Sequence, residues 1–98
     1  MCSWYTEDVK ELFEAVLTLD SVEACRCFFE DACTVKEIIE IAQRLKVAKM
    51  LRSGSSYAYI NKETGVSTAT ISRVSRCLDY GSGGYDAVLK KLEEERKN

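Results

Sequence analysis

The sequence contains no histidine and no proline among its 98 residues, and it has no long hydrophobic run. Without histidine, the common acid–base and nucleophile–base pairs cannot form, so we expect no enzyme activity. The absence of proline, together with long periodic stretches, favours an all-α fold. The longest charge-free stretch is about nine residues, far below the ~20 apolar residues that a membrane-spanning helix needs. We therefore expect a helical protein with no membrane partner.

A secretory signal is also lacking, because the N-terminal residues MCSWYTEDVKE are acidic and contain no apolar stretch. This favours a cytoplasmic location. The five cysteines, at positions 2, 25, 27, 33 and 77, are odd in number and do not suggest a disulfide framework. Cys25 and Cys27 would point to different faces of a helix, which does not suit a metal site. We expect no metal and no cofactor.

Charge is unevenly distributed along the chain, although the net charge is only −2. Residues 1–35 carry two basic against eight acidic residues, a net charge of −6. Residues 36–76 carry eight basic against three acidic residues, a net charge of +5. A basic patch is what contact with phosphate requires. The middle of the chain is therefore the candidate surface for nucleic acid, although a solvated helix face would give a similar count.

Apolar periodicity and capping residues predict six helices, at 7–17, 22–32, 35–52, 57–64, 68–79 and 85–96. Thr6, Ser21 and Ser67 are placed to cap helices, and Thr34 with Glu37 fits a capping box. We expect a single domain, residues 1–98, with a helical dimerisation core at about 7–52 and 85–96. The apolar stripes are broad for so small a chain, which favours a homodimer over a compact monomeric bundle.

The most informative segment is the pair of short helices around Gly65, which predicts a helix-turn-helix at residues 56–79. A tight turn between helices needs a residue that tolerates positive φ, and glycine does so. Ile60 before the turn, and Val66, Ile71 and Val74 after it, have the spacing that packs the two helices against each other. The opposite face of the second helix is then free.

This free face is small, polar and basic, as entry into a DNA major groove requires. Small side chains allow close approach to base edges, hydroxyl groups can bond to bases or phosphates, and arginines can contact phosphates. An ordinary helical hairpin with a solvated outer face is the alternative. The candidate DNA-binding residues of this helix are Ser67, Thr68, Ala69, Ser72, Arg73, Ser75 and Arg76.

The string Ala69-Thr70-Ile71-Ser72-Arg73 resembles the Trp repressor superfamily, as do Cys33-Thr34, Gln43-Arg44-Leu45 and Leu51-Arg52-Ser53-Gly54. The stretches 28–38, 42–54 and 64–81 are similar to its YerC/YecD branch of Trp-repressor-related proteins. The resemblance covers residues 10–92 and implies a six-helix, intertwined homodimer that reads a palindromic operator in duplex DNA. It also implies that Ala58 and Asn61 lie at DNA-contacting positions.

The same resemblance implies a ligand pocket formed by Thr34, Arg44, Thr70 and Arg73. The chain departs from the tryptophan-binding pattern at Asp31, Cys33, Val74 and Cys77. Val74 stands where the family has a glycine and would fill space in a tight pocket, while an aspartate is unfavourable beside an indole. We therefore do not expect tryptophan to bind, and an unidentified small-molecule effector remains an open alternative.

The function these residues favour is a transcriptional regulator, of the repressor type, that binds duplex DNA in a sequence-specific way without tryptophan. The alternative is a helical protein-interaction module that keeps the fold but does not bind specific DNA. The basic central segment and the small-residue helix face favour the regulator.

Overall fold

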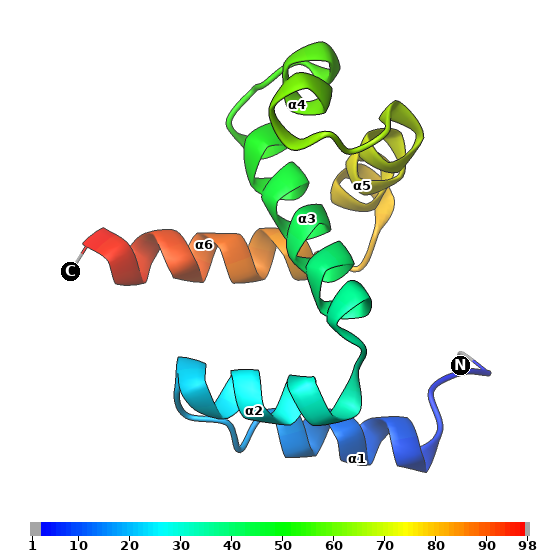
Figure 1. Ribbon diagram of the computed structural model, residues 1–98, viewed down its shortest axis with the longest axis vertical. Helices are drawn as coiled ribbons and strands as arrows, with labels where there is room; N and C mark the ends of the chain where they lie inside the picture. Colours follow the sequence, from blue (N-terminus) through cyan, green and yellow to red (C-terminus); the bar gives the residue numbers. More distant parts are fainter. Residues whose placement is uncertain (1–2, 98) are drawn as a thin grey trace. The chain divides into compact units, whose positions relative to one another are not determined.

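The computed structural model describes residues 3–97, which form six α-helices and no strand (Figure 1). This confirms the all-α class, with helix ends within two residues of those predicted. Cys2 lies outside the described residues. No helix within residues 3–97 is both long and apolar enough to cross a membrane. The helices are α1 Glu7–Val16, α2 Val22–Ala32, α3 Val35–Arg52, α4 Tyr57–Thr64, α5 Thr68–Tyr80 and α6 Gly84–Lys97.

Side-chain caps begin five of these helices, because the first backbone N–H groups of a helix have no intrahelical acceptor. The hydroxyl oxygens of four N-cap residues accept from the N–H three residues later, at 3.0–3.2 Å; these residues are Thr6, Ser21, Ser56 and Ser67. At the start of α3, Thr34 and Glu37 form the predicted capping box. The Thr34 N–H donates to the Glu37 carboxylate at 2.9 Å, and the Glu37 N–H donates to Thr34 Oγ1 at 3.1 Å.

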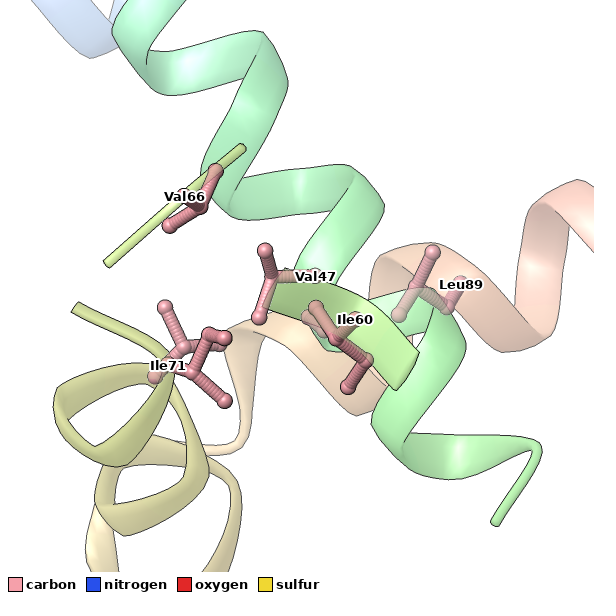
Figure 2. Packing of buried hydrophobic residues seen from close by; sticks show 7 residues of the cluster. Val47, Ile60, Val66, Ile71 and Leu89 are labelled. Carbon is pink, nitrogen blue, oxygen red and sulfur yellow. The ribbon is translucent and has the colours of Figure 1, made fainter. Parts of the chain in front are cut away.

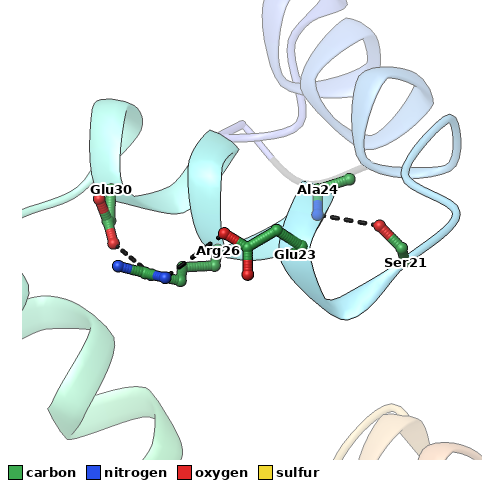
Figure 3. A network of polar contacts seen from close by, with 5 residues as sticks. All are labelled: Ser21, Glu23, Ala24, Arg26 and Glu30. Atoms are coloured by element: carbon green, nitrogen blue, oxygen red, sulfur yellow. Dashed lines mark hydrogen bonds and ion pairs between the residues drawn. The ribbon is translucent and has the colours of Figure 1, made fainter.

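Internal contacts divide the chain after Ile38 into two units. The N-terminal unit contains α1, α2 and the first turn of α3. Neither α1 nor α2 has a buried residue, and Trp4 and Leu17 are 60% and 84% exposed. Local contacts stabilise α2, where Arg26 donates to Glu30 at 2.7 Å and lies 3.4 Å from Glu23 (Figure 3). Within this unit the apolar faces of the helices therefore lack a core of their own.

The C-terminal unit, from Ile39 onward, contains the buried core of the described chain. Its members come from α3, α4, the turn after α4, α5 and α6, and all are apolar (Figure 2). In this unit α4 contacts α5, and α5 contacts α6. The core therefore holds the predicted helix-turn-helix against the C-terminal part of α3. Its residues are Val47, Ala48, Ile60, Val66, Ile71, Val74 and Leu89.

Arg52, at the C-terminal end of α3, joins that helix to α6. Its Nε lies 3.0 Å from the Asp86 carboxylate, and its Nη1 donates to Glu93 at 3.1 Å. Exposed ion pairs of this kind add little to stability individually. The two carboxylates do, however, neutralise the charge of Arg52 locally, so this arginine is not available to bind phosphate.

Because the side chain of Ile60 is fully buried in the core, shortening it should lower the stability of the protein. Ile60→Ala should lower the free energy of unfolding by about 2–5 kcal/mol, because it removes apolar contacts and leaves a cavity. Urea denaturation at one fixed protein concentration measures the change. Lys62→Ala, an exposed substitution on the same helix, should stay within about 0.5 kcal/mol. Equal effects of the two substitutions would contradict the assigned core.

The capping box predicts the titration of Glu37. The hydrogen bond from the Thr34 backbone N–H, followed by that with the Thr34 side chain, lowers the pKa of the Glu37 carboxyl. A lowered folded-state pKa contributes stability above the unfolded-state pKa, and this stability is lost as pH falls through the folded-state pKa. An NMR titration should therefore find a lower midpoint for Glu37 in the protein than in an unfolded peptide spanning residues 32–40.

The matched variant for this titration is Glu37→Gln, which keeps a side-chain acceptor for the Thr34 N–H but cannot ionise. In this variant, the protection factors of the amides at the start of α3, which are corrected for the intrinsic pH dependence of exchange, should no longer change across the titration range of Glu37. A Glu37 midpoint at or above that of the peptide would contradict the capping box.

Candidate nucleic-acid interface

The turn between α4 and α5 consists of Gly65, Val66 and Ser67. Gly65 has φ +74°, in the left-handed region, and its N–H donates to the Asn61 carbonyl at the end of α4. A side chain at this φ would be strained, so the predicted need for glycine is confirmed. Val66 is buried in the core, and Ser67 caps α5. The chain thus passes from one helix into the next within three residues.

Two polar side chains of α4 hold this turn. The side-chain amide of Asn61 donates to the Val66 carbonyl at 2.8 Å. The Thr64 hydroxyl donates to the Ile60 carbonyl at 2.7 Å and accepts from the Val66 N–H at 3.1 Å. Sequence reasoning does not find this role of Thr64 and Asn61, although a polar residue just before a glycine turn is a weak signal for it.

Helix α5 has one buried and one exposed face. Ile71 and Val74 are buried in the core, at 0% and 2% exposure. Several predicted contact residues lie on the exposed part of the helix-turn-helix, and Ser72 and Ser75 are half-buried. The structure thus leaves a small, polar surface on α5 accessible, as the spacing predicts. The exposed residues are Ala58, Asn61, Ser67, Thr68, Ala69, Arg73 and Arg76.

The cations of this surface are not neutralised by neighbouring carboxylates. Within residues 3–97, no ion pair or side-chain hydrogen bond involves Lys62, Arg73 or Arg76. An arginine without an acidic partner can donate to phosphate oxygens. The surface therefore combines hydroxyl and methyl groups with the two available positive charges of Arg73 and Arg76, and Lys62 adds an unpaired charge on α4.

A cleft of about 420 Å³ lies beside the start of α5, between α5 and α3. It brings together three of the four predicted pocket residues, Arg44, Thr70 and Arg73; the fourth, Thr34, belongs to the N-terminal unit. Val74 does not line this cleft; its side chain packs in the core, as the spacing around Gly65 predicts. The lining consists of Glu40, Gln43, Arg44, Gly65, Val66, Ser67, Thr70 and Arg73.

Comparison with known proteins places this geometry in a family. The family model described as Trp repressor protein matches residues 7–93. The chain is 50% identical over 88 residues to the uncharacterized protein YerC of Bacillus subtilis (strain 168), covering 90% of this chain and 85% of that protein.

Two solved structures share both fold and sequence. A TrpR-like protein from Eubacterium eligens superposes with a TM-score of 0.87 at 49% identity, covering 91% of this chain and 92% of that chain. A protein from Staphylococcus aureus, assigned as a Trp repressor, has a TM-score of 0.86 at 49% identity, covering 90% and 88%. With the family model spanning nearly all of its length, the chain belongs to the Trp repressor family.

Proposed function

We propose that this protein is a sequence-specific regulator of transcription that binds duplex DNA through α5. The observation that carries the proposal is the exposed, small and polar N-terminal part of α5, held in place by a buried face on the same helix. A helix with this division can enter the major groove while its other side stays packed on the protein. Family membership supports the same function.

The groups available on α5 match the chemistry of base edges. Thr68 and Ala69 lie in its first turn and are exposed. Their methyl groups can contact thymine methyls, and the Thr68 hydroxyl can donate to or accept from a base. Ser72 lies one turn further along the same helix and adds a second hydroxyl. We propose these three as the residues that distinguish sequences.

Other residues of the surface are positioned to contact the phosphates of the DNA backbone. Ser67 lies at the N-terminal end of α5, where helix dipole and free backbone N–H groups favour an anion. Arg73 and Arg76 extend from α5 without acidic partners in the described chain, and Ser75 lies between them in sequence. Contacts of this kind position the helix but do not distinguish sequences. Ala58 on α4 is small enough to allow close approach of the backbone.

We further propose that the protein acts as a homodimer on a two-fold symmetric operator, in the manner of a repressor. The observation behind the dimer is the N-terminal unit, in which α1 and α2 bury no residue while aromatic and aliphatic side chains are exposed. Exposed apolar surface of this extent marks an interaction site. A second copy would bury it and would place two α5 helices on successive turns of DNA.

The cleft between α3 and α5 is the candidate effector pocket of such a regulator. Among its lining side chains only Val66 is apolar, whereas two are arginines and one is a glutamate. An indole needs apolar surface to offset its burial. We therefore propose that DNA binding does not depend on tryptophan, and that any effector taken by Arg44, Thr70 and Arg73 is polar.

Selection of random duplex DNA by the purified protein tests the proposal. The protein should enrich a two-fold symmetric site at about 50 mM salt, a low salt concentration that favours phosphate contacts. The same site should be enriched with and without tryptophan. Enrichment only with tryptophan would contradict the effector proposal. No enrichment in either condition would contradict specific DNA binding and favour a helical protein-interaction module.

Two substitutions should distinguish residues that contact phosphates from residues that contact bases. Arg73→Ala should weaken binding to all duplexes and reduce the salt dependence by about one phosphate contact. Thr68→Ala should instead relax the preference at particular base pairs, at a cost of about 1–3 kcal/mol for a good contact. Fluorescence anisotropy with the selected site and a scrambled duplex measures both. If neither substitution changed binding, this face of α5 would not be the contact surface.

A further inference from the structure

We infer that Asn61 is a positioning residue for DNA recognition: its side-chain amide sets the direction in which α5 leaves the turn. This inference rests on the proposed function and changes the role of Asn61 from a contact to a support. Its basis is the hydrogen bond from Asn61 Nδ2 to the Val66 carbonyl, at 2.8 Å, between the end of α4 and the residue before the N-cap of α5.

Every group of Val66 has a partner. The backbone N–H donates to Thr64 Oγ1 at 3.1 Å, the carbonyl accepts from Asn61, and the side chain is buried in the core at 8% exposure. Because the peptide group is planar, fixing the Val66 carbonyl also fixes the Ser67 nitrogen. The peptide plane that leads into α5 is therefore held by Asn61.

Both polar partners of Val66 come from α4, so they fix the start of α5 relative to α4. The Thr64 hydroxyl is itself anchored, because it donates to the Ile60 carbonyl at 2.7 Å. Gly65 between them has a positive φ and no side chain that would restrict it. Without the two hydrogen bonds, Val66 would be held only by the burial of its side chain.

A small rotation at the turn has a large effect on readout. Ser72 lies four residues from the first residue of α5, about 6 Å along the helix axis, so a tilt of about 10° at the turn displaces it by about 1 Å. Hydrogen bonds to base edges tolerate less than this, since their donor–acceptor distances span only about 0.5 Å. Loss of the Asn61 bond should consequently reduce the discrimination between DNA sequences more than it reduces attraction to phosphate.

The experiment compares substitutions that all lie on α4. Asn61→Ala removes the amide, and Asn61→Asp keeps its size but replaces the donor by an acceptor that faces the Val66 carbonyl. Thr64→Val removes the second hydrogen-bonding group of the turn at a residue with no proposed DNA contact. Tyr59→Phe, on the exposed side of α4, is the matched control.

The first measurement is amide exchange in the free protein at the start of α5, where the Thr70 and Ile71 N–H groups bond to Ser67. Exchange should become about tenfold faster in Asn61→Ala, Asn61→Asp and Thr64→Val, and should not change in Tyr59→Phe. Unchanged exchange in the Asn61 variants would overturn the inference. Because Thr64→Val tests the same turn, the result does not depend on one variant remaining folded.

The second measurement is the ratio of affinities for the selected site and a scrambled duplex. This ratio should fall about tenfold in the Asn61 and Thr64 variants, with the salt dependence of binding to the scrambled duplex unchanged. A salt slope reduced by about one would assign Asn61 to a phosphate contact instead. A changed preference at a single base pair, with Thr64→Val normal, would assign it to a base contact and also overturn the inference.

A double-substitution cycle adds the energetic test. If Asn61 acts through α5, the effects of Asn61→Ala and Thr68→Ala on the affinity ratio should not add. Additive effects would indicate an independent contact and overturn the inference. Failure of the wild-type protein to select any DNA would overturn the proposed function, and with it the role of Asn61 in recognition, whereas the exchange result would still report on the turn.

Discussion

The buried contact between α5 and the core is the interaction on which the candidate DNA surface depends. On one face of α5, Ile71 packs in the buried cluster with Val47 and Ile60 (Figure 2), and Val74 belongs to the same cluster. Within residues 3–97 the core has seven buried residues and none of them is polar. Such packing is strong but not directional, so it fixes which side of α5 is buried more firmly than the angle at which the helix lies.

Directional contacts at the turn complement this packing. Hydrogen bonds have preferred distances and angles, and a buried carbonyl that loses its partner is costly. The bonds of Asn61 and Thr64 to Val66 therefore define the angle that apolar packing leaves open. The division is physical: burial decides which face of α5 is free, and the turn decides where that face points.

The sequence predicted the features that depend on neighbouring residues. Helix boundaries followed from caps such as Ser67 and from Gly65, because capping and positive φ act within four residues. The core positions Ile60 and Ile71 followed from helical periodicity. Contacts across the chain were not predictable in this way. Arg52 pairs with Asp86 and Glu93 on α6, and periodicity contains no information on such pairs.

Val74 shows what the helical period does predict. Its buried position follows from the same α5 period that buries Ile71, as expected from the spacing around Gly65. Of the basic central segment, Arg52 is neutralised by two carboxylates, whereas Arg73 and Arg76 on α5 have no ion-pair partner within residues 3–97. Phosphate contacts position a protein on DNA but do not distinguish sequences. In the proposed complex, recognition therefore depends on the fit of Thr68, Ala69 and Ser72 to the bases, and that fit is only as accurate as the turn that sets the direction of α5.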